Sequence, residues 1–193
     1  MFNFILAVVV LVATPGPALM SIVGVGAAFG FKVGVVYVAG VILGANFVSL
    51  LTVSGLFAFL TAFPRLQFLL TTISVCYLCY IAYRIATSKV GLDTTSKPVK
   101  IGLSDGIVIQ LLNPKACVIA LALFSGSPFL DHSLKIETIL KFLIANSIWV
   151  PAHLAWLYLG ITLNKFDLSP AKNRIVNRAL AFLMIIAVLL SII

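Results

Sequence analysis

Residues 111–117 read LLNPKAC and place a helix breaker and a full positive charge inside a strongly apolar stretch. Proline opens a helix, so a half-helix that starts after Pro114 offers unpaired N–H groups and the positive end of the helix dipole. An ammonium at the centre of a membrane helix costs about 2.5–3.5 kcal/mol, which makes Lys115 a candidate functional residue. Asn113, Pro114 and Lys115 therefore predict a binding site for a carboxylate. The alternative is that Lys115 reaches an interface or bonds a local carbonyl group.

A second break with the same chemistry lies in VATPGPALM, residues 12–20. The half-helix after Pro17 again offers free N–H groups. Gly16 has no side chain to keep a ligand away from the backbone. Irregular backbone survives inside a bilayer only against protein or a wet cavity. We therefore expect Pro15, Gly16 and Pro17 to form part of the same site.

Further candidates follow a 3-4-3 spacing at Asn146, Trp149, His153 and Trp156, so they share one helix face. An indole ring attracts an ammonium group, so Trp149 is expected to contact the substrate. His153 is the candidate for proton coupling, because the ordinary pKa of histidine lies near neutrality. The alternatives are a tryptophan of the interfacial belt and a histidine bonded inside the helix bundle.

Asn46 and Asn146 end the similar triplets GAN and IAN. A buried amide needs hydrogen-bond partners, and either the substrate or the opposite broken backbone would supply them. The predicted substrate-binding set is Pro15, Gly16, Pro17, Asn46, Asn113, Pro114, Lys115, Asn146 and Trp149.

Three cysteines support an alternative function. Cys76 and Cys79 form CYLC, a redox spacing, and Cys117 lies beside the NPKA break. A membrane-embedded thiol–disulfide relay is therefore the rival hypothesis. The sequence has no metal-ligand motif and no phosphate loop. We expect no metal, no cofactor, no enzymatic reaction and no direct use of ATP.

The elements that must position these residues are membrane helices. The chain has 193 residues, 62% of them hydrophobic and 9% charged, with a mean hydropathy of +1.21. Soluble domains carry roughly 25% charged residues. A membrane span needs about 20 apolar residues, and this rule predicts six spans, at residues 2–28, 35–60, 66–84, 104–128, 137–160 and 176–193. The predicted fold is an all-α integral membrane protein with a single transmembrane domain.

The net charge of +8 comes from basic residues scattered among the apolar spans, which argues against a nucleic-acid partner. With the N-terminus outside, nine basic residues fall in inner loops and three on the outer side. Cytoplasmic loops carry the excess of lysine and arginine. Both termini are therefore predicted on the non-cytoplasmic side.

A three-span unit occurs twice. Pro15 precedes Asn46 by 31 residues, and Pro114 precedes Asn146 by 32 residues. Because three is odd, the copies must cross the membrane in opposite senses, an arrangement that recurs in secondary transporters. The predicted boundaries are about 1–86 for repeat one, 87–103 for a cytoplasmic linker and 104–193 for repeat two, with spans one and four broken at their prolines.

Gly40 and Gly44 form a GxxxG step in span two, which permits close contact between helices. Packing inside the bundle and a homodimer both satisfy this spacing.

The motifs PGP, NPKA and SIWVP, with Gly34, Gly40 and Gly44 in span two, resemble the LysE-type translocators, exporters of lysine, homoserine, threonine and related amino acids. The resemblance covers essentially the whole chain. It implies a six-span exporter from the cytoplasm to the outside, driven by proton antiport. We predict that the protein lies in the plasma (inner) membrane and works by alternating access, in which one half rocks against the other. Many members carry an Asp where this chain has Ala45-Asn46, and a polar residue where it has Ala18, so the coupling ion and the substrate stay open.

Overall fold

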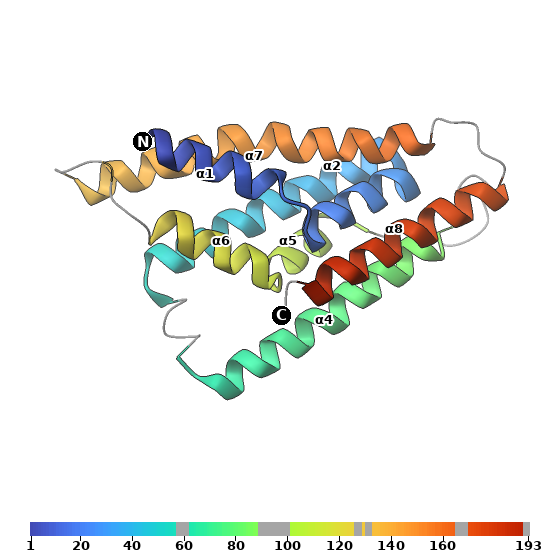
Figure 1. The fold of residues 1–193 in the computed structure, drawn as a ribbon, viewed down its shortest axis with the longest axis horizontal. Helices are drawn as coiled ribbons and strands as arrows, with labels where there is room; N and C mark the ends of the chain where they lie inside the picture. The colour runs from blue at the N-terminus through green and yellow to red at the C-terminus, as the bar shows by residue number, and fades with distance from the viewer. Residues whose placement is uncertain (57–61, 89–100, 126–128, 130–132, 165–169, 191–193) are drawn as a thin grey trace.

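The computed structural model describes residues 1–56, 62–88, 101–125, 129, 133–164 and 170–190. This part of the chain is helical, without strands (Figure 1). The helices are α1 (Phe2–Ala13), α2 (Pro17–Val53), α4 (Pro64–Ala86), α5 (Leu103–Leu111), α6 (Pro114–Phe124), α7 (Leu134–Asn164) and α8 (Pro170–Leu190). The predicted span ends at 57–60, 126–128 and 191–193, and most of the predicted linker, lie outside the described residues.

The first break separates α1 from α2 at the predicted place. Thr14 ends α1 in an extended conformation, and its hydroxyl donates to the carbonyl oxygen of Val10 at 2.8 Å. Pro17 is the first residue of α2, where its missing N–H group costs no hydrogen bond. Prolines on both sides of Gly16 therefore keep the chain from continuing as one helix.

Helix α2 contains a turn at a single residue. Gly30 has φ 77° and ψ −171°, a backbone region open essentially to glycine alone. The sequence predicts a connection between residues 28 and 35, but helical hydrogen bonding resumes directly after Gly30. The two arms of α2 run in different directions on either side of this residue (Figure 1).

The second break bends α5 against α6 by 69°. Asn113 caps α6, because its side-chain oxygen accepts from the backbone N–H of Lys115 at 3.1 Å, and Pro114 is the first helical residue. At the other end of α5, Asp105 accepts from the backbone N–H of Gly102 at 2.9 Å. The starts of α5 and α6 are thus each fixed by a polar side chain, Asp105 and Asn113.

The chain is a multi-pass membrane protein. By length and composition, four described helices can each cross a bilayer, namely Pro17–Val53, Phe68–Ala86, Leu134–Leu163 and Ala171–Leu190. The bent pair α5 and α6 adds a fifth span if it crosses as one. α1 is apolar but shorter. Large hydrophobic side chains are exposed along these helices, as a lipid environment favours.

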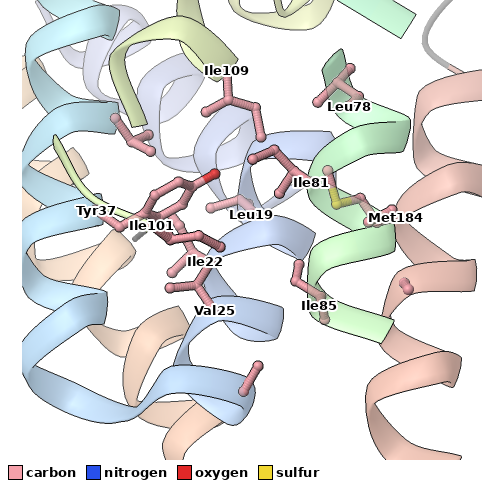
Figure 2. Packing of buried hydrophobic residues seen from close by; sticks show 14 of the residues in the cluster. Leu19, Ile22, Val25, Tyr37, Leu78, Ile81, Ile85, Ile101, Ile109 and Met184 are labelled. Carbon is pink, nitrogen blue, oxygen red and sulfur yellow. The ribbon is translucent and has the colours of Figure 1, made fainter. Parts of the chain in front are cut away.

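The largest buried cluster joins both arms of α2 to α4, α5, α7 and α8 (Figure 2). Tyr37 is a fully buried member of this cluster and donates from its hydroxyl to the hydroxyl of Ser21 at 2.8 Å. Glycines bring the backbones of α2 and α5 into contact, because a Cβ atom on Gly40 would overlap the carbonyl of Leu103. Gly44 likewise faces Gln110 of α5. The GxxxG step is therefore used for packing inside this bundle.

Candidate functional site

The two breaks meet through Lys115. Its ammonium nitrogen, Nζ, donates to the carbonyl oxygens of Thr14 at 2.6 Å and Pro15 at 3.2 Å. These carbonyls lie at the end of α1, where the helix dipole is negative. A Cβ atom on Gly16 would lie 2.8 Å from Cδ of Lys115, so glycine makes room for the lysine stem. Lys115 does bond carbonyls, but those of the opposite break and not local ones.

A cavity of about 60 Å³ adjoins this contact. By volume it has room for roughly four water molecules. Its lining comes from α1, α2, α5, α6 and α7 and includes both breaks. The polar lining residues are Thr14, Ser49, Gln110, Asn113, Lys115, Trp149 and His153. The larger apolar ones are Leu11, Val12, Leu19 and Ile119. The cavity therefore combines a small polar region with an apolar wall.

The starts of two helices face this cavity. In α2, Pro17 has no N–H group and Met20 donates to the carbonyl of Gly16 at 2.9 Å, which leaves the N–H groups of Ala18 and Leu19 without an intrahelical partner. In α6, the N–H group of Ala116 likewise has no intrahelical partner. All three residues line the cavity. Free N–H groups at helix starts favour an anion.

A wider groove of about 500 Å³ lies against the same contact. It shares Thr14, Gly16 and Lys115 with the cavity, and its other walls are mostly apolar residues of α8. Pro15 lines this groove. The Lys115 contact is thus common to two spaces, one among the helices and one beside α8.

Trp149 and His153 both line the cavity and are buried. Nδ1 of His153 lies 2.6 Å from the carbonyl oxygen of Trp149 in the same helix, so one ring nitrogen is engaged. Trp156, which the spacing puts on the same face, packs instead against the hydrophobic clusters of α2 and α8. The predicted face of α7 therefore contributes its middle residues to the cavity.

Asn46 and Asn146 bond each other. Nδ2 of Asn46 donates to Oδ1 of Asn146 at 2.8 Å, and the return bond is 2.7 Å. Each amide also donates to the carbonyl four residues earlier in its own helix. Both N–H donors of each amide are used, and neither residue is in the cavity lining. Pro17 and Pro114 are also outside the lining and contribute as the first residues of α2 and α6.

Gln110, Thr14 and Ser49 are polar lining residues that the sequence does not predict, and Gln110 is distinguished by its unpaired side-chain oxygen. Its side chain is 8% exposed, and its Oε1 atom has no hydrogen-bond partner among the described residues. The available signal is an amide in an apolar run, three residues before Asn113. Nothing in that run reveals that the acceptor stays unpaired.

Two ion pairs between described residues lie outside the cavity. Arg84 approaches Asp105 at 3.4 Å, and the Tyr77 hydroxyl donates to the same carboxylate oxygen at 3.1 Å. Lys141 pairs with Glu137 at 2.8 Å, and both are buried near the start of α7. Lys141 is one of the three basic residues that the predicted topology assigns to the outer side, but its side chain is buried in the protein.

The cysteines do not form a cluster that would favour the thiol relay. Cys76 and Cys79 are free and exposed on α4, and Cys117 is a free, partly buried residue of α6. Within the described ranges, no group of three or more metal-ligating side chains comes together.

Comparison with known proteins identifies the family. The model of the LysE type translocator family matches residues 9–192. A leucine efflux protein of Klebsiella pneumoniae subsp. pneumoniae is 24% identical over 153 residues, which cover 77% of this chain and 71% of that protein. No solved structure matches the chain. Because the family model spans nearly the whole sequence, the chain belongs to the LysE type translocator family.

Proposed function

We propose that this protein is a secondary transporter that exports an amino acid from the cytoplasm. One observation carries the proposal: Lys115 joins the two proline breaks beside a cavity that both breaks line. Broken membrane helices with their ends directed at a shared site are the usual means by which transporters bind small charged solutes. Membership of a translocator family supports the same class of function.

The carboxylate of the substrate binds at the starts of α2 and α6. The N–H groups of Ala18, Leu19 and Ala116 are available as donors there. Lys115 adds a full positive charge within the same lining. In the present arrangement its ammonium is held by the carbonyls of Thr14 and Pro15, so an incoming carboxylate competes with them for it.

The apolar wall favours an aliphatic side chain. Leu11, Val12, Leu19 and Ile119 offer only hydrocarbon to the substrate. The similar Klebsiella protein is named for leucine efflux. We therefore take a neutral aliphatic amino acid, with leucine as the first to test, as the substrate. Because the cavity has room for only roughly four waters, a whole amino acid requires the lining residues to move apart.

The architecture we propose is six spans in one domain, with inverted repeats at about 1–86 and 104–193 and a cytoplasmic linker at 87–103. The turn at Gly30 supports it, because it divides α2 into two arms that would serve as parts of spans one and two. The Asn46–Asn146 pair supports it as well, since its members are 100 residues apart and make matching bonds to their own helices.

Transport follows by alternating access, in which one repeat rocks against the other. Lys115 belongs to the second repeat and its acceptors to the first, so their contact is made and broken by such a motion. The positive-inside distribution supports an inner-membrane location with both termini on the non-cytoplasmic side. Proton antiport supplies the driving force, with His153 as the proton site because it lines the cavity.

The test is counterflow in proteoliposomes that hold the purified protein and a mixture of amino acids, read by mass spectrometry with and without a pH gradient. We expect selective exchange of leucine or a close relative, and accumulation driven by the gradient. His153→Gln should abolish the gradient-driven part and leave exchange intact.

A protein without Cys76, Cys79 and Cys117 should exchange at the same rate, because the cysteines have no part in the proposed mechanism. If no amino acid moved with the wild type, the export function would be refuted. Loss of exchange on removal of the cysteines would point to the thiol relay.

A further inference from the structure

Gln110 lines the cavity and carries an unpaired hydrogen-bond acceptor. The residue is more than nine-tenths buried, and its Oε1 atom has no partner among the described residues. Gln110 lies on α5, one turn before the break, and Gly44 of α2 leaves space for its Cβ atom. A buried polar atom without a partner is uncommon in folded proteins and calls for a ligand or another explanation.

A zwitterionic substrate needs such an acceptor. An amino acid carries an ammonium group beside its carboxylate, and the cavity lining contains no aspartate or glutamate to receive it. The two described carboxylates near the bundle, Asp105 and Glu137, are paired with Arg84 and Lys141 instead. The ammonium must therefore bond neutral oxygen atoms or an aromatic face.

The other side-chain oxygens of the lining each take part in one hydrogen bond. The hydroxyl of Thr14 donates to the carbonyl of Val10, and that of Ser49 donates to the carbonyl of Ala45 at 2.9 Å. The Asn113 oxygen accepts from the N–H group of Lys115. Among these described oxygens, Oε1 of Gln110 alone is without any hydrogen bond.

We propose that Oε1 of Gln110 accepts a hydrogen bond from the α-ammonium group of the substrate, with the ring of Trp149 as a second contact for the same charge. This inference rests on the proposed function and completes it, since the carboxylate lies at the helix starts and Lys115. Gln110 then distinguishes an amino acid from a carboxylic acid of the same shape.

Thermal stability can distinguish a ligand-binding role of Gln110 from a structural one, because its Oε1 atom is unpaired. A buried acceptor without a partner destabilises the ligand-free protein, so its removal should not lower thermal stability. Asn177 gives the matched contrast: it is a buried amide of α8 whose Nδ2 donates to Ser88 at 2.9 Å. Removal of that paired amide should lower stability without any effect on ligand selectivity.

The experiment compares the affinities of L-leucine and 4-methylpentanoate, which is leucine without its ammonium group, for purified protein in detergent. Binding is measured by calorimetry in the wild type, Gln110→Met and the control Asn177→Leu. In Gln110→Met we expect the ratio of the leucine affinity to the 4-methylpentanoate affinity to fall about tenfold or more. This is the change in affinity that loss of a hydrogen bond to a charged group produces. The thermal midpoint without ligand should be equal to that of the wild type or higher.

An unchanged preference for leucine in Gln110→Met would overturn the proposal, whether or not the thermal midpoint falls. If Gln110→Met did not fold, Gln110→Glu would replace it, because it keeps the oxygen and adds a negative charge; its preference for leucine should then exceed that of the wild type. Wild-type protein that neither binds nor exchanges leucine or any other amino acid would refute the proposed function itself, which is a separate outcome.

Discussion

Lys115 is the side chain whose replacement tests the carboxylate site most directly. Lys115→Met removes the ammonium and keeps most of the stem that passes Gly16. We expect the Kd for leucine to rise tenfold or more, because a hydrogen bond to a charged group contributes about 1.5–3 kcal/mol. Calorimetry on detergent-purified protein and the initial rate of counterflow would measure the change.

Lys135→Met is the matched control, since Lys135 is an exposed residue near the start of α7 and lies outside the cavity lining. It removes one lysine charge from the chain without touching the site. If both variants kept the wild-type Kd and rate, Lys115 would not bind the carboxylate.

Individual residues were predicted from the sequence only where their chemistry conflicts with their surroundings. Lys115 stands out because a charge in an apolar run is costly. Gln110 does not, because an amide is tolerated in a membrane helix once it finds a partner. Whether Oε1 finds one depends on packing against α2, and a single sequence does not determine this.

At the scale of elements, the turn in α2 depends on glycine at position 30. Its φ of 77° is unfavourable for any residue with a Cβ atom, while no neighbouring atom lies within 4 Å of the place such an atom would occupy. Gly30→Ala should therefore lower the free energy of unfolding by about 1–3 kcal/mol through backbone strain alone. Chemical unfolding in detergent would measure it.

Gly102→Ala is the companion variant, because Gly102 is equally open but has an extended backbone with φ −154°. Its effect should be clearly smaller. Equal losses of stability in the two variants would show that Gly30 is not held in a strained conformation.

The helix breaks were predicted where the structure has them, because proline acts locally on the backbone. A connection was predicted over residues 28–35, but the sequence did not indicate that it consists of a turn at Gly30 alone. The chain contains other glycines in the same stretch, such as Gly24 and Gly26, whose role is close packing against α4 and α7. The sequence around each of these glycines is similar. The packing of the two arms of α2 therefore decides which glycine adopts the turn conformation.

For the whole molecule, the Asn46–Asn146 pair joins segments that lie 100 residues apart. Replacement of one asparagine by leucine leaves the other amide without its partner, which should cost about 1–3 kcal/mol. Replacement of both removes the unsatisfied group, so the double variant should be less destabilised than the sum of the singles by about 0.5–3 kcal/mol. Thermal unfolding of the four proteins would give this coupling energy.

Transport by the double variant decides between the two alternatives for these residues. If the pair only joins the two parts of the chain, folded Asn46→Leu/Asn146→Leu protein should still exchange leucine. Loss of exchange in a stable double variant would instead assign the amides to the substrate.

The matched distances of Asn46 and Asn146 from Pro15 and Pro114 indicate related positions. Their bond to each other was not predicted, since the sequence suggested the substrate or the opposite broken backbone as partners. The cavity beside them was not predicted either, since its walls come from five helices and depend on how closely these approach. Repeats in a sequence carry information on symmetry, whereas the volume between helices is set by side-chain packing throughout the bundle.

The bond between Lys115 and the end of α1 has a consequence for biosynthesis. Helix α6 has 11 residues, roughly 17 Å of helix at 1.5 Å per residue, which is well short of the ~30 Å hydrocarbon core. Its second residue is Lys115, so it is poorly suited to enter a bilayer by itself. Its acceptors, Thr14 and Pro15, leave the ribosome about 100 residues earlier. Synthesis from the N-terminus therefore places the carbonyl oxygens in the membrane before the charge that they solvate.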